Sequence, residues 1–253
     1  MKQTNFTIIV SKRDQAGLNI AKNLEKLNIK VNYFDKDSIN LENIDKKIHT
    51  DFIIFATKHQ GKKQNMLSLH APGNWNKADF GGKPNQICNT SALVLKHFFK
   101  ILNKNKKNYE ATLEVTHHGP FIETPCLFIE IGGTEKDWQD KKAGEIIAKT
   151  IQEAINSNLE KYESSIAVGG PHYCPNFNKI QLNSKYAISH IIPQYAFPIK
   201  RQMLEQAIKK TKEKISFIII DWKGLKSQER QETIKLCDEL GLGVKRTSEI
   251  EKD

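Results

Sequence analysis

The sequence predicts an α/β fold in which a mixed, mostly parallel sheet lies between helices in a three-layer α/β/α arrangement. Short apolar segments rich in β-branched residues alternate along the chain with longer segments whose apolar residues recur at helical spacing. This alternation favours ligand sites at the carboxyl ends of parallel strands. The 253 residues contain no internal repeat or clear linker, so we expect a single α/β domain over 1–253, or two closely packed lobes.

The first half of the chain begins with a strand–helix–strand pattern. In the first helix Leu18, Ala21 and Leu24 recur at helical spacing, and the second helix has its candidate N-cap within 89–91. His97 falls in the apolar stripe of that second helix, so we interpret it as a core or boundary residue. We expect strands at 5–10, 30–34, 51–56, 66–70, 110–116 and 126–131, and helices at 15–27 and from about 89 to 101.

The second half continues the alternation. A helix is expected from Thr134 to about Asn158, because 134–137 carry a weak capping-box start. The short strand expected at 165–168 ends on the Gly169-Gly170 pair. The remaining elements are a strand at 187–192, a helix at 199–211, a strand at 216–221 and a helix at 227–240.

The composition is that of a globular protein, with 38% hydrophobic and 27% charged residues. No window approaches the roughly 18 to 20 apolar residues of a membrane span, and the start shows no cleavable signal, so we expect a cytoplasmic protein without a membrane partner. The four cysteines form no Cys-x-x-Cys pair, which argues against a disulfide framework or a thiolate zinc cluster. We expect Cys88, Cys126 and Cys237 to be buried free thiols.

The formal net charge of +10 comes from lysine runs spread over the chain. Such a field attracts polyanions, and it favours nucleic acid over an acidic protein partner. Solvated helix faces and biased codon usage produce the same composition, so charge alone does not establish RNA binding. No obligate protein partner is evident from the sequence.

Histidines concentrate at or just past the ends of predicted strands. Six of the eight do so: His59, His70, His117, His118, His172 and His190. Strand ends at one edge of an α/β sheet converge in space, and imidazole suits a zinc site of about three protein ligands and an open position. A single strand-end histidine is more often a hydrogen-bonded boundary residue, and we prefer that interpretation for His59 and His190.

The segment Glu-Val-Thr-His-His-Gly-Pro at 114–120 is the exception to that interpretation. In a regular strand Glu114 and Thr116 would point to one face, and His117 to the other. The following Gly-Pro forces a bend, so that His118 and one neighbour can turn inward. A helical His-Glu-x-x-His signature is absent, which leaves the standard zinc-protease interpretation without support.

Two further side chains are candidates for chemistry. Glu130 lies within the apolar strand 127–131, where an ionised carboxylate is costly unless it is paired or faces a metal. Cys174 follows His172 closely and is a candidate nucleophile, although a packed thiol is the simpler interpretation.

Four motifs in order resemble the archaeal and plant type of D-aminoacyl-tRNA deacylase. They are His-Ala-Pro-Gly-Asn at 70–74, the 114–120 segment, Phe-Ile-Glu-Ile-Gly-Gly-Thr-Glu at 128–135 with Trp138, and Gly-Gly-Pro-His-Tyr-Cys-Pro at 169–175. The resemblance spans about 5 to 245. Gly133 stands where that family commonly has Ser, and Cys174 where it has a small residue such as Ala, which puts specificity in doubt more than activity.

The resemblance implies chiral proofreading: hydrolysis of the ester that joins a mischarged D-amino acid to the 3′-terminal ribose of tRNA. It also implies zinc dependence and a fold similar to phosphorylase and peptidyl-tRNA hydrolase. We expect the catalytic residues to be Glu114, Thr116, His117, His118, Glu130 and His172. We expect substrate contacts from His70, Gly73, Asn74, Gly81, Gly82, Gly169, Gly170 and Tyr173.

If zinc is bound, we expect His117 or His118, His172 and one of Glu114 or Glu130 to hold it, with a water of lowered pKa as nucleophile. Glycine turns at 81–82 or 169–170 would offer N–H groups to the oxyanion, and Thr116 would orient the substrate. A histidine general base or assistance by the ribose 2′-hydroxyl are alternatives that the sequence leaves open.

Two other classes of protein compete with a deacylase. A metal-dependent amidase or peptidase on a similar fold is opposed only mildly by the basic charge. A noncatalytic RNA-binding protein is opposed by the grouping of Glu and His at strand ends, and by the lack of an RNP-like aromatic strand or a Gly-x-x-Gly clamp.

Overall fold

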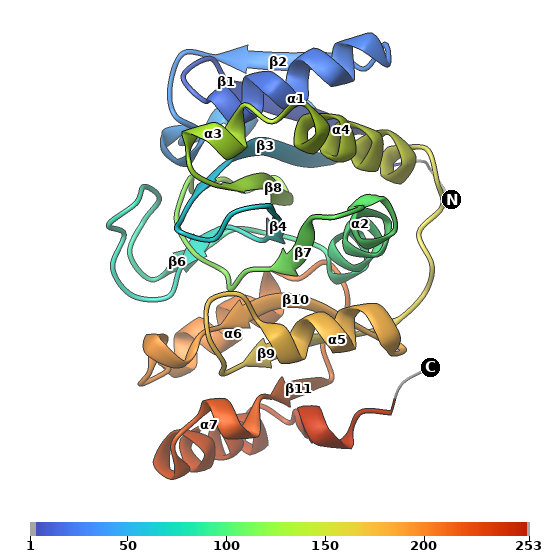
Figure 1. Ribbon diagram of the computed structural model, residues 1–253. Coiled ribbons are helices and arrows are strands. Elements are labelled where there is room, and N and C mark those ends of the chain that lie inside the picture. Colours follow the sequence, from blue (N-terminus) through green and yellow to red (C-terminus); the bar gives the residue numbers. More distant parts are fainter. Residues whose placement is uncertain (1–3, 252–253) are drawn as a thin grey trace.

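Two sheets lie edge to edge in the chain, and Figure 1 shows their strands stacked from β2 at one end to β11 towards the other. The computed structural model describes residues 4–251. The first sheet has the order β2-β1-β3-β8-β4-β7, and only the β4–β8 pairing is antiparallel. The second sheet, β10-β9-β11-β12, is wholly parallel. The expected mixed, mostly parallel sheet structure is confirmed.

The strands of the first sheet are β1 (Phe6–Ser11), β2 (Val31–Phe34), β3 (Phe52–Gln60), β4 (Met66–His70), β7 (Glu110–Leu113) and β8 (Cys126–Gly133). Those of the second are β9 (Glu163–Val168), β10 (Tyr186–Ile192), β11 (Phe217–Ile220) and β12 (Gly243–Arg246). A small hairpin-like pair, β5 (Gly73–Asn74) and β6 (Gln86–Ile87), lies outside both.

The helices are α1 (Gln15–Lys26), α2 (Ala92–Asn105), α3 (Glu135–Trp138), α4 (Lys141–Ile155), α5 (Pro175–Asn183), α6 (Arg201–Lys209) and α7 (Ser227–Glu239). Short 3₁₀ turns are η1 (Ser38–Asn40), η2 (Ile44–Lys47), η3 (Gln194–Ala196), η4 (Trp222–Gly224) and η5 (Thr247–Glu249). No helix between residues 4 and 251 combines the length and the apolar character that crossing a membrane requires.

Successive side chains of each strand point to opposite faces of the sheet, so the apolar core forms separate clusters on the two faces. Leu127, Ile129 and Ile131 of β8 join one large cluster with α1, α2, α4 and α5, on a face shared by both sheets. The opposite face of the first sheet carries Phe128 and is covered by apolar residues of η1, η2 and nearby loops. The opposite face of the second sheet packs against α6 and α7. The third layer is therefore helical over the second sheet, and is built of turns and loops over the first.

The four-stranded sheet contains a change of direction between β9 and β11. The chain passes from β9 through α5 to β10 on one side, and then returns past β9 to β11 and β12 on the other. Phe177 of α5 packs on one face, with Ala167 and Ile219, whereas Leu204 of α6 packs on the other, with Ile166. Helices on opposite faces diverge at this point, which is where open α/β sheets form their ligand crevices.

Several elements differ from the sequence prediction. The helix expected over 134–158 is two helices, because the Asp140 side chain accepts the Lys142 N–H and caps α4 anew. The strand expected over 110–116 ends at Leu113, because Val115 N–H donates to His172 O and Thr116 N–H to Ile191 O. The sequence analysis also missed α5 and β12.

Thr116 joins the two sheets. Its N–H donates to the Ile191 carbonyl at 3.0 Å, and its Oγ1 accepts the Ile191 N–H at 3.1 Å. The side chain is buried and lies 3.2 Å from Nδ1 of His190. Within residues 4–251 these contacts of the hydroxyl are structural, and its expected role in orienting the substrate stays a prediction.

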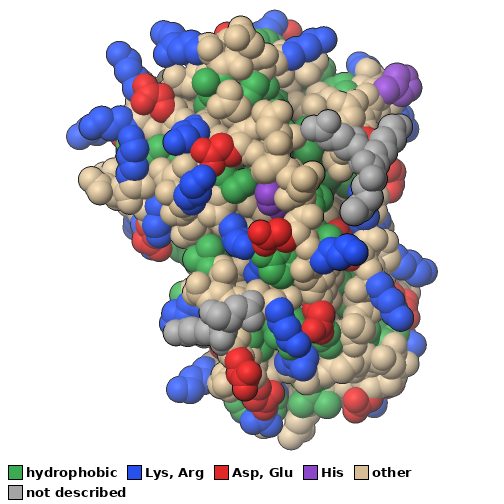
Figure 2. All heavy atoms as spheres, turned by 90° about the vertical axis from the view of Figure 1, so that its right-hand side faces the viewer, with side chains coloured by type: hydrophobic (Ala, Val, Ile, Leu, Met, Phe, Trp, Pro, Cys, Tyr) green, Lys and Arg blue, Asp and Glu red, His purple; other side chains and the backbone are tan. Residues whose placement is uncertain are grey.

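Basic side chains are diffuse on the face seen in Figure 2, where Lys and Arg are scattered from one end to the other with Asp and Glu among them. The four cysteines are buried and free, as expected for three of them. Cys126 and Cys88 lie together in the core, and burial raises the pKa of the Cys126 thiol well above its usual value.

Candidate active site

The first layer of the site follows from the pairing register of β3, β8 and β4. Thr57 and Ser68 are both register partners of Glu130, and therefore share its face of the sheet. His70 pairs with Phe128, two residues from Glu130, so its side chain lies on that face as well. His59, two residues beyond Thr57, belongs to the same face. One face of three strands thus brings two histidines to a buried glutamate.

Glu130 is held at the floor of the site by hydroxyl groups. Its Oε1 accepts a hydrogen bond from Thr57 Oγ1 at 2.7 Å, and its Oε2 a longer one from Ser68 Oγ at 3.5 Å. The same Oε2 lies 3.6 Å from His59 Nδ1 and 3.7 Å from His70 Nε2. The buried acid expected from the sequence is therefore both paired and aimed at imidazoles.

Glu114 is the centre of the site. Its Oε2 lies 2.8 Å from His172 Nε2, 3.1 Å from His59 Nδ1 and 3.5 Å from His117 Nε2. The side chain is fully buried, and Oε1 has no hydrogen-bond partner among residues 4–251. Burial acts to raise the pKa of Glu114, but the hydrogen bonds from His172 and His59 outweigh it and hold the pKa well below the usual value.

Glu114 can contact His117 because β7 ends at Leu113 and the chain turns away from β4 at Glu114. The strict alternation that would separate Glu114 from His117 therefore does not apply, and the two side chains meet. His118 has a left-handed backbone with φ of 47°, and its ring lies 4.3 Å from that of His117 and 4.8 Å from that of His70, between centroids.

Hydrogen bonds assign the protons of three imidazoles. Nδ1 of His70, His117 and His118 lies 3.1, 2.9 and 2.6 Å from the carbonyls of Ala71, Val115 and Gly119. A carbonyl only accepts, so each Nδ1 carries hydrogen and each neutral ring keeps a lone pair on Nε2. Burial, with the neighbouring histidines, lowers the pKa of His118 to about 4, which favours that neutral form.

A histidine that donates its second ring nitrogen to a carbonyl has the arrangement typical of metal ligands. Three overlapping sets place their ligand atoms within 4.8 Å of one another: His59, Glu114, His117 and His172; His70, His117 and His118; and His70, Glu114 and Glu130. His70 and Glu114 belong to these sets, and among residues 4–251 neither Nε2 of His70 nor Oε1 of Glu114 has a hydrogen-bond partner. The residues present therefore fit a metal ion with nitrogen and oxygen ligands.

The site opens to solvent past His172. Its side chain is 29% exposed, against 11% for His59 and 0% for Glu114. His172 Nδ1 lies 3.2 Å from the hydroxyl of Tyr195, a residue that is 61% exposed. The hydroxyl of Tyr173 lies 3.1 Å from His59 Nε2. The sequence analysis names Tyr173 as a substrate contact and interprets His59 as a boundary residue, and it gives no indication of Tyr195, Thr57 or Ser68.

Among the expected substrate contacts, Gly73 and Asn74 lie directly behind the histidine pair. The Gly73 N–H donates to the carbonyls of His118 and His117, at 2.7 and 3.1 Å. The Asn74 amide donates to the Gly81 carbonyl at 2.9 Å, which ties the 76–84 loop to this edge. Gly73 and Asn74 therefore support the backbone of the histidine pair.

Two of the four glycines expected to donate to an oxyanion have occupied N–H groups, and Cys174 is the packed thiol that the sequence analysis preferred. The Gly82 N–H donates to Glu42 and the Gly169 N–H to the Ile192 carbonyl, so neither is free for an oxyanion. The Gly170 N–H is packed against the backbone of Gly224. Cys174 is buried and burial raises the pKa of its thiol well above the usual value, which argues against a nucleophile.

Fold and site together define an α/β protein with a histidine–carboxylate cluster suited to metal-assisted chemistry. The chain belongs to the D-aminoacyl-tRNA deacylase family, whose sequence model matches residues 46–245. The family resemblance drawn from the four motifs is confirmed.

Relatives from archaea match nearly the whole chain. The D-aminoacyl-tRNA deacylase of Pyrococcus furiosus is 36% identical over 93% of this chain and 97% of its own. That of Methanocaldococcus jannaschii is 33% identical over 94% and 97%. The crystal structure of the conserved protein of unknown function AF0625 superposes with a TM-score of 0.92 at 28% identity, covering 100% of this chain and 99% of that one. The similarity therefore extends over the complete fold.

His190 lies outside the cluster, in β10, and yields a prediction about stability. Burial lowers its pKa from 6.5 to about 3, so the unfolded chain takes up a proton first as the pH falls. The neutral imidazole makes its full contribution to the free energy of unfolding above pH 6.5. That contribution falls by about 1.4 kcal/mol per pH unit as the pH decreases from 6.5 towards 3. We expect the free energy of unfolding in urea, measured between pH 7 and pH 5, to fall less for His190→Gln than for the wild type once the pH is below 6.5. A difference that stays constant with pH would contradict this assignment.

Proposed function

We propose that this protein hydrolyses the ester bond of D-aminoacyl-tRNA and releases the free D-amino acid and tRNA. Membership of the deacylase family supports the substrate class. The observation that carries the chemistry is the buried Glu114 carboxylate contacted by His59, His117 and His172 at a solvent-open edge. An ester to a ribose hydroxyl is an activated acyl group, so it needs a positioned water and a proton acceptor more than a strong nucleophile.

The Glu114–His172 pair supplies a proton acceptor. Glu114 Oε2 fixes the hydrogen on His172 Nε2, which leaves the lone pair of the neutral ring on Nδ1. Nδ1 faces the exposed Tyr195 hydroxyl and the open side of the site. Buried carboxylates hold catalytic imidazoles in one tautomer in the same way. In this proposal His172 accepts the proton of the attacking water, and Tyr195 helps to orient the ring.

Zinc is the metal that we propose for the cluster, because three imidazole nitrogens and carboxylate oxygens match its preferred ligands. His70, His117 and His118, whose Nε2 lone pairs are available, would hold it beside Glu114 and Glu130, and His172 is then left to act as the general base. When bound, such an ion lowers the pKa of water towards neutrality and polarises a carbonyl oxygen. Glu130, fixed by Thr57 and Ser68, adds negative charge that favours a cation in this part of the site.

Exposed aromatic rings beside the cluster support a single-stranded RNA end as substrate. Phe80 is 70% exposed, and its carbonyl accepts the N–H of Gly119, next to His118. Tyr195 is exposed beside His172, and the Asn76 amide ties the two segments by donating to the Ala196 carbonyl at 3.1 Å. Bases stack on such rings whatever their sequence, which suits a tRNA acceptor end.

Deacylation of one amino acid in both configurations on the same tRNA tests the proposed function. We expect release of the D-amino acid and little release of its L-form. His172→Ala should lower the rate about 100-fold or more, as loss of a general base does, while His49→Ala, exposed and outside the cluster, should keep it. Equal rates on both configurations, or no release at all, would remove the proposal.

Metal analysis tests the zinc part separately. The purified protein should contain zinc, chelation should abolish hydrolysis of D-aminoacyl-tRNA, and added zinc should restore it. His117→Ala should lose the metal because it removes a ligand shared by two sets, whereas His97→Ala on α2 should retain it. Full activity of a metal-free preparation would contradict a zinc-assisted mechanism and leave the His172 general base in its place.

A further inference from the structure

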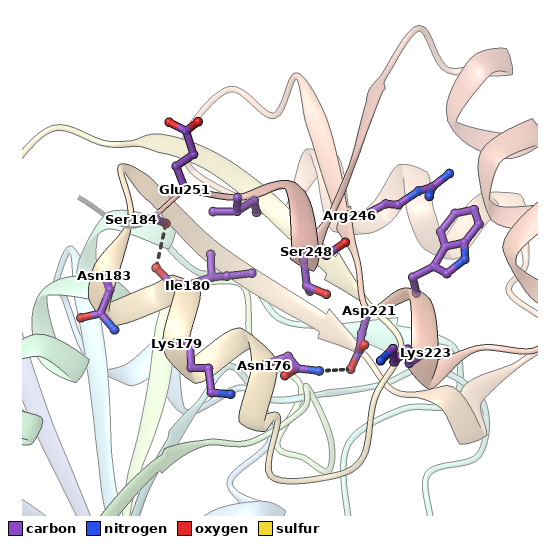
Figure 3. A pocket seen from close by; sticks show the side chains of 13 residues that line it. Asn176, Lys179, Ile180, Asn183, Ser184, Asp221, Lys223, Arg246, Ser248 and Glu251 are labelled. Carbon is purple, nitrogen blue, oxygen red and sulfur yellow. Dashed lines mark hydrogen bonds between the residues drawn. The ribbon is translucent and has the colours of Figure 1, made fainter.

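A second cavity, of about 380 Å³, lies at the carboxyl edge of the four-stranded sheet and is absent from the chemistry described above. Its walls are α5, the segment that follows β11 and the segment that follows β12. It therefore opens beside the point where α5 and the helices of the opposite face diverge, the usual place for a ligand crevice in such a sheet. Figure 3 shows the side chains that line it.

The floor of the cavity is a buried acid and its amide partner. Asp221, the residue after β11, is 5% exposed, and its Oδ2 accepts a hydrogen bond from Asn176 Nδ2 at 3.0 Å. Ser248 comes from the β12 side and faces the same space (Figure 3). These groups offer acceptors and donors of the kind that hydroxyl groups of a ligand require.

Two lysines flank this floor. Figure 3 shows Lys179, from α5, and Lys223, from the turn after β11, on opposite sides of the Asn176–Asp221 pair. Both are exposed, and neither forms an ion pair with any residue between 4 and 251. Arg246 adds a third cation to the lining, with its guanidinium 3.8 Å from the ring centroid of Trp222.

The two lysines and the buried Asp221 carboxylate together favour one class of ligand. Free lysines attract phosphate, but a buried carboxylate between them would repel a simple anion. A ribonucleotide satisfies both, because its phosphate meets the cations while its ribose hydroxyls donate to the carboxylate, as in dinucleotide-binding sheets. The 2′-hydroxyl is also the group by which proteins distinguish RNA from DNA.

The cavity is connected to the catalytic cluster by one short segment. His172 reaches the cluster, and Asn176 reaches the cavity four residues later. The backbone at Gly170 packs against Gly224, since a Cβ on Gly224 would lie 2.5 Å from Gly170 N. The two sites thus lie on the two sides of the loop after β9.

We propose that this cavity binds a ribose–phosphate unit of RNA; resting on the proposed function, that unit is a nucleotide of tRNA upstream of the 3′-terminal adenosine. Lys179 and Lys223 contact its phosphate, and Asp221 accepts from its 2′-hydroxyl. The cavity then fixes the direction in which the acceptor strand approaches His172.

Binding of deacylated tRNA to charge-reversed variants tests the proposal. Lys179→Glu/Lys223→Glu should weaken binding about 10-fold or more and reduce the slope of log affinity against log salt by about one per lysine. The matched control is Lys22→Glu/Lys30→Glu, which makes the same change in charge at exposed positions on α1 and before β2. An equal loss in the two double variants would show a general electrostatic effect and overturn the site.

A hairpin ending in CCA, made as RNA and as DNA, tests the ribose contact. The wild type should prefer RNA, and Asp221→Asn should lose most of that preference while its urea unfolding stays close to that of the wild type. Unchanged preference in the variant overturns the role of Asp221. Both binding measurements need only deacylated RNA. The deacylase proposal fails if the wild type releases no D-amino acid, and that outcome is independent of the binding results.

Discussion

The site depends on one buried carboxylate that three imidazoles contact. An isolated ionised glutamate in a protein interior costs several kcal/mol, and hydrogen bonds to the charged form are what make it tolerable. Glu114 obtains those bonds from His172 and His59, which come from different sheets. Its position therefore holds together elements that nothing in the local sequence associates. Its second oxygen has no hydrogen-bond partner in the described part of the chain, which leaves capacity for a cation.

The junction of the two sheets is also what builds the site. After Leu113 the backbone leaves β4, and the N–H groups of Val115 and Thr116 bond to His172 and Ile191 instead. This exchange of partners brings the loop after β9 against the histidine pair, so that folding the second sheet onto the first completes the cluster. Glu130, anchored by neighbouring hydroxyls within one sheet, forms the part of the site that is built by strand register alone.

Sequence reasoning succeeded where information is local. The strand at 126–131, the helix at 15–27 and the strand-end position of His117 and His172 follow from periodicity and breakers within a few residues. It failed at α5, a nine-residue helix that starts on Pro175 in a loop-like composition, and at β12, whose residues are partly exposed. Both lie around the further cavity.

The site residues divide in the same manner. The sequence interprets His59 as a boundary residue, because a single strand-end histidine carries no sign of its partner Glu114, which comes from the segment after β7. Tyr195 lies in a short turn whose only signal is tertiary, its contact with His172. The N–H groups of Gly82 and Gly169 are occupied by Glu42 and Ile192, partners that no glycine motif reveals. Long-range pairing, rather than residue type, decides these roles.

The substitution Glu114→Gln tests the central claim most directly, because it removes one charge and keeps the size of the side chain. The measurement is the rate of D-aminoacyl-tRNA hydrolysis together with the free energy of unfolding in urea. If Glu114 organises the histidines through its charge, the rate should fall about 100-fold or more, while the variant remains folded. A rate within a few-fold of the wild type in a folded variant would contradict the account.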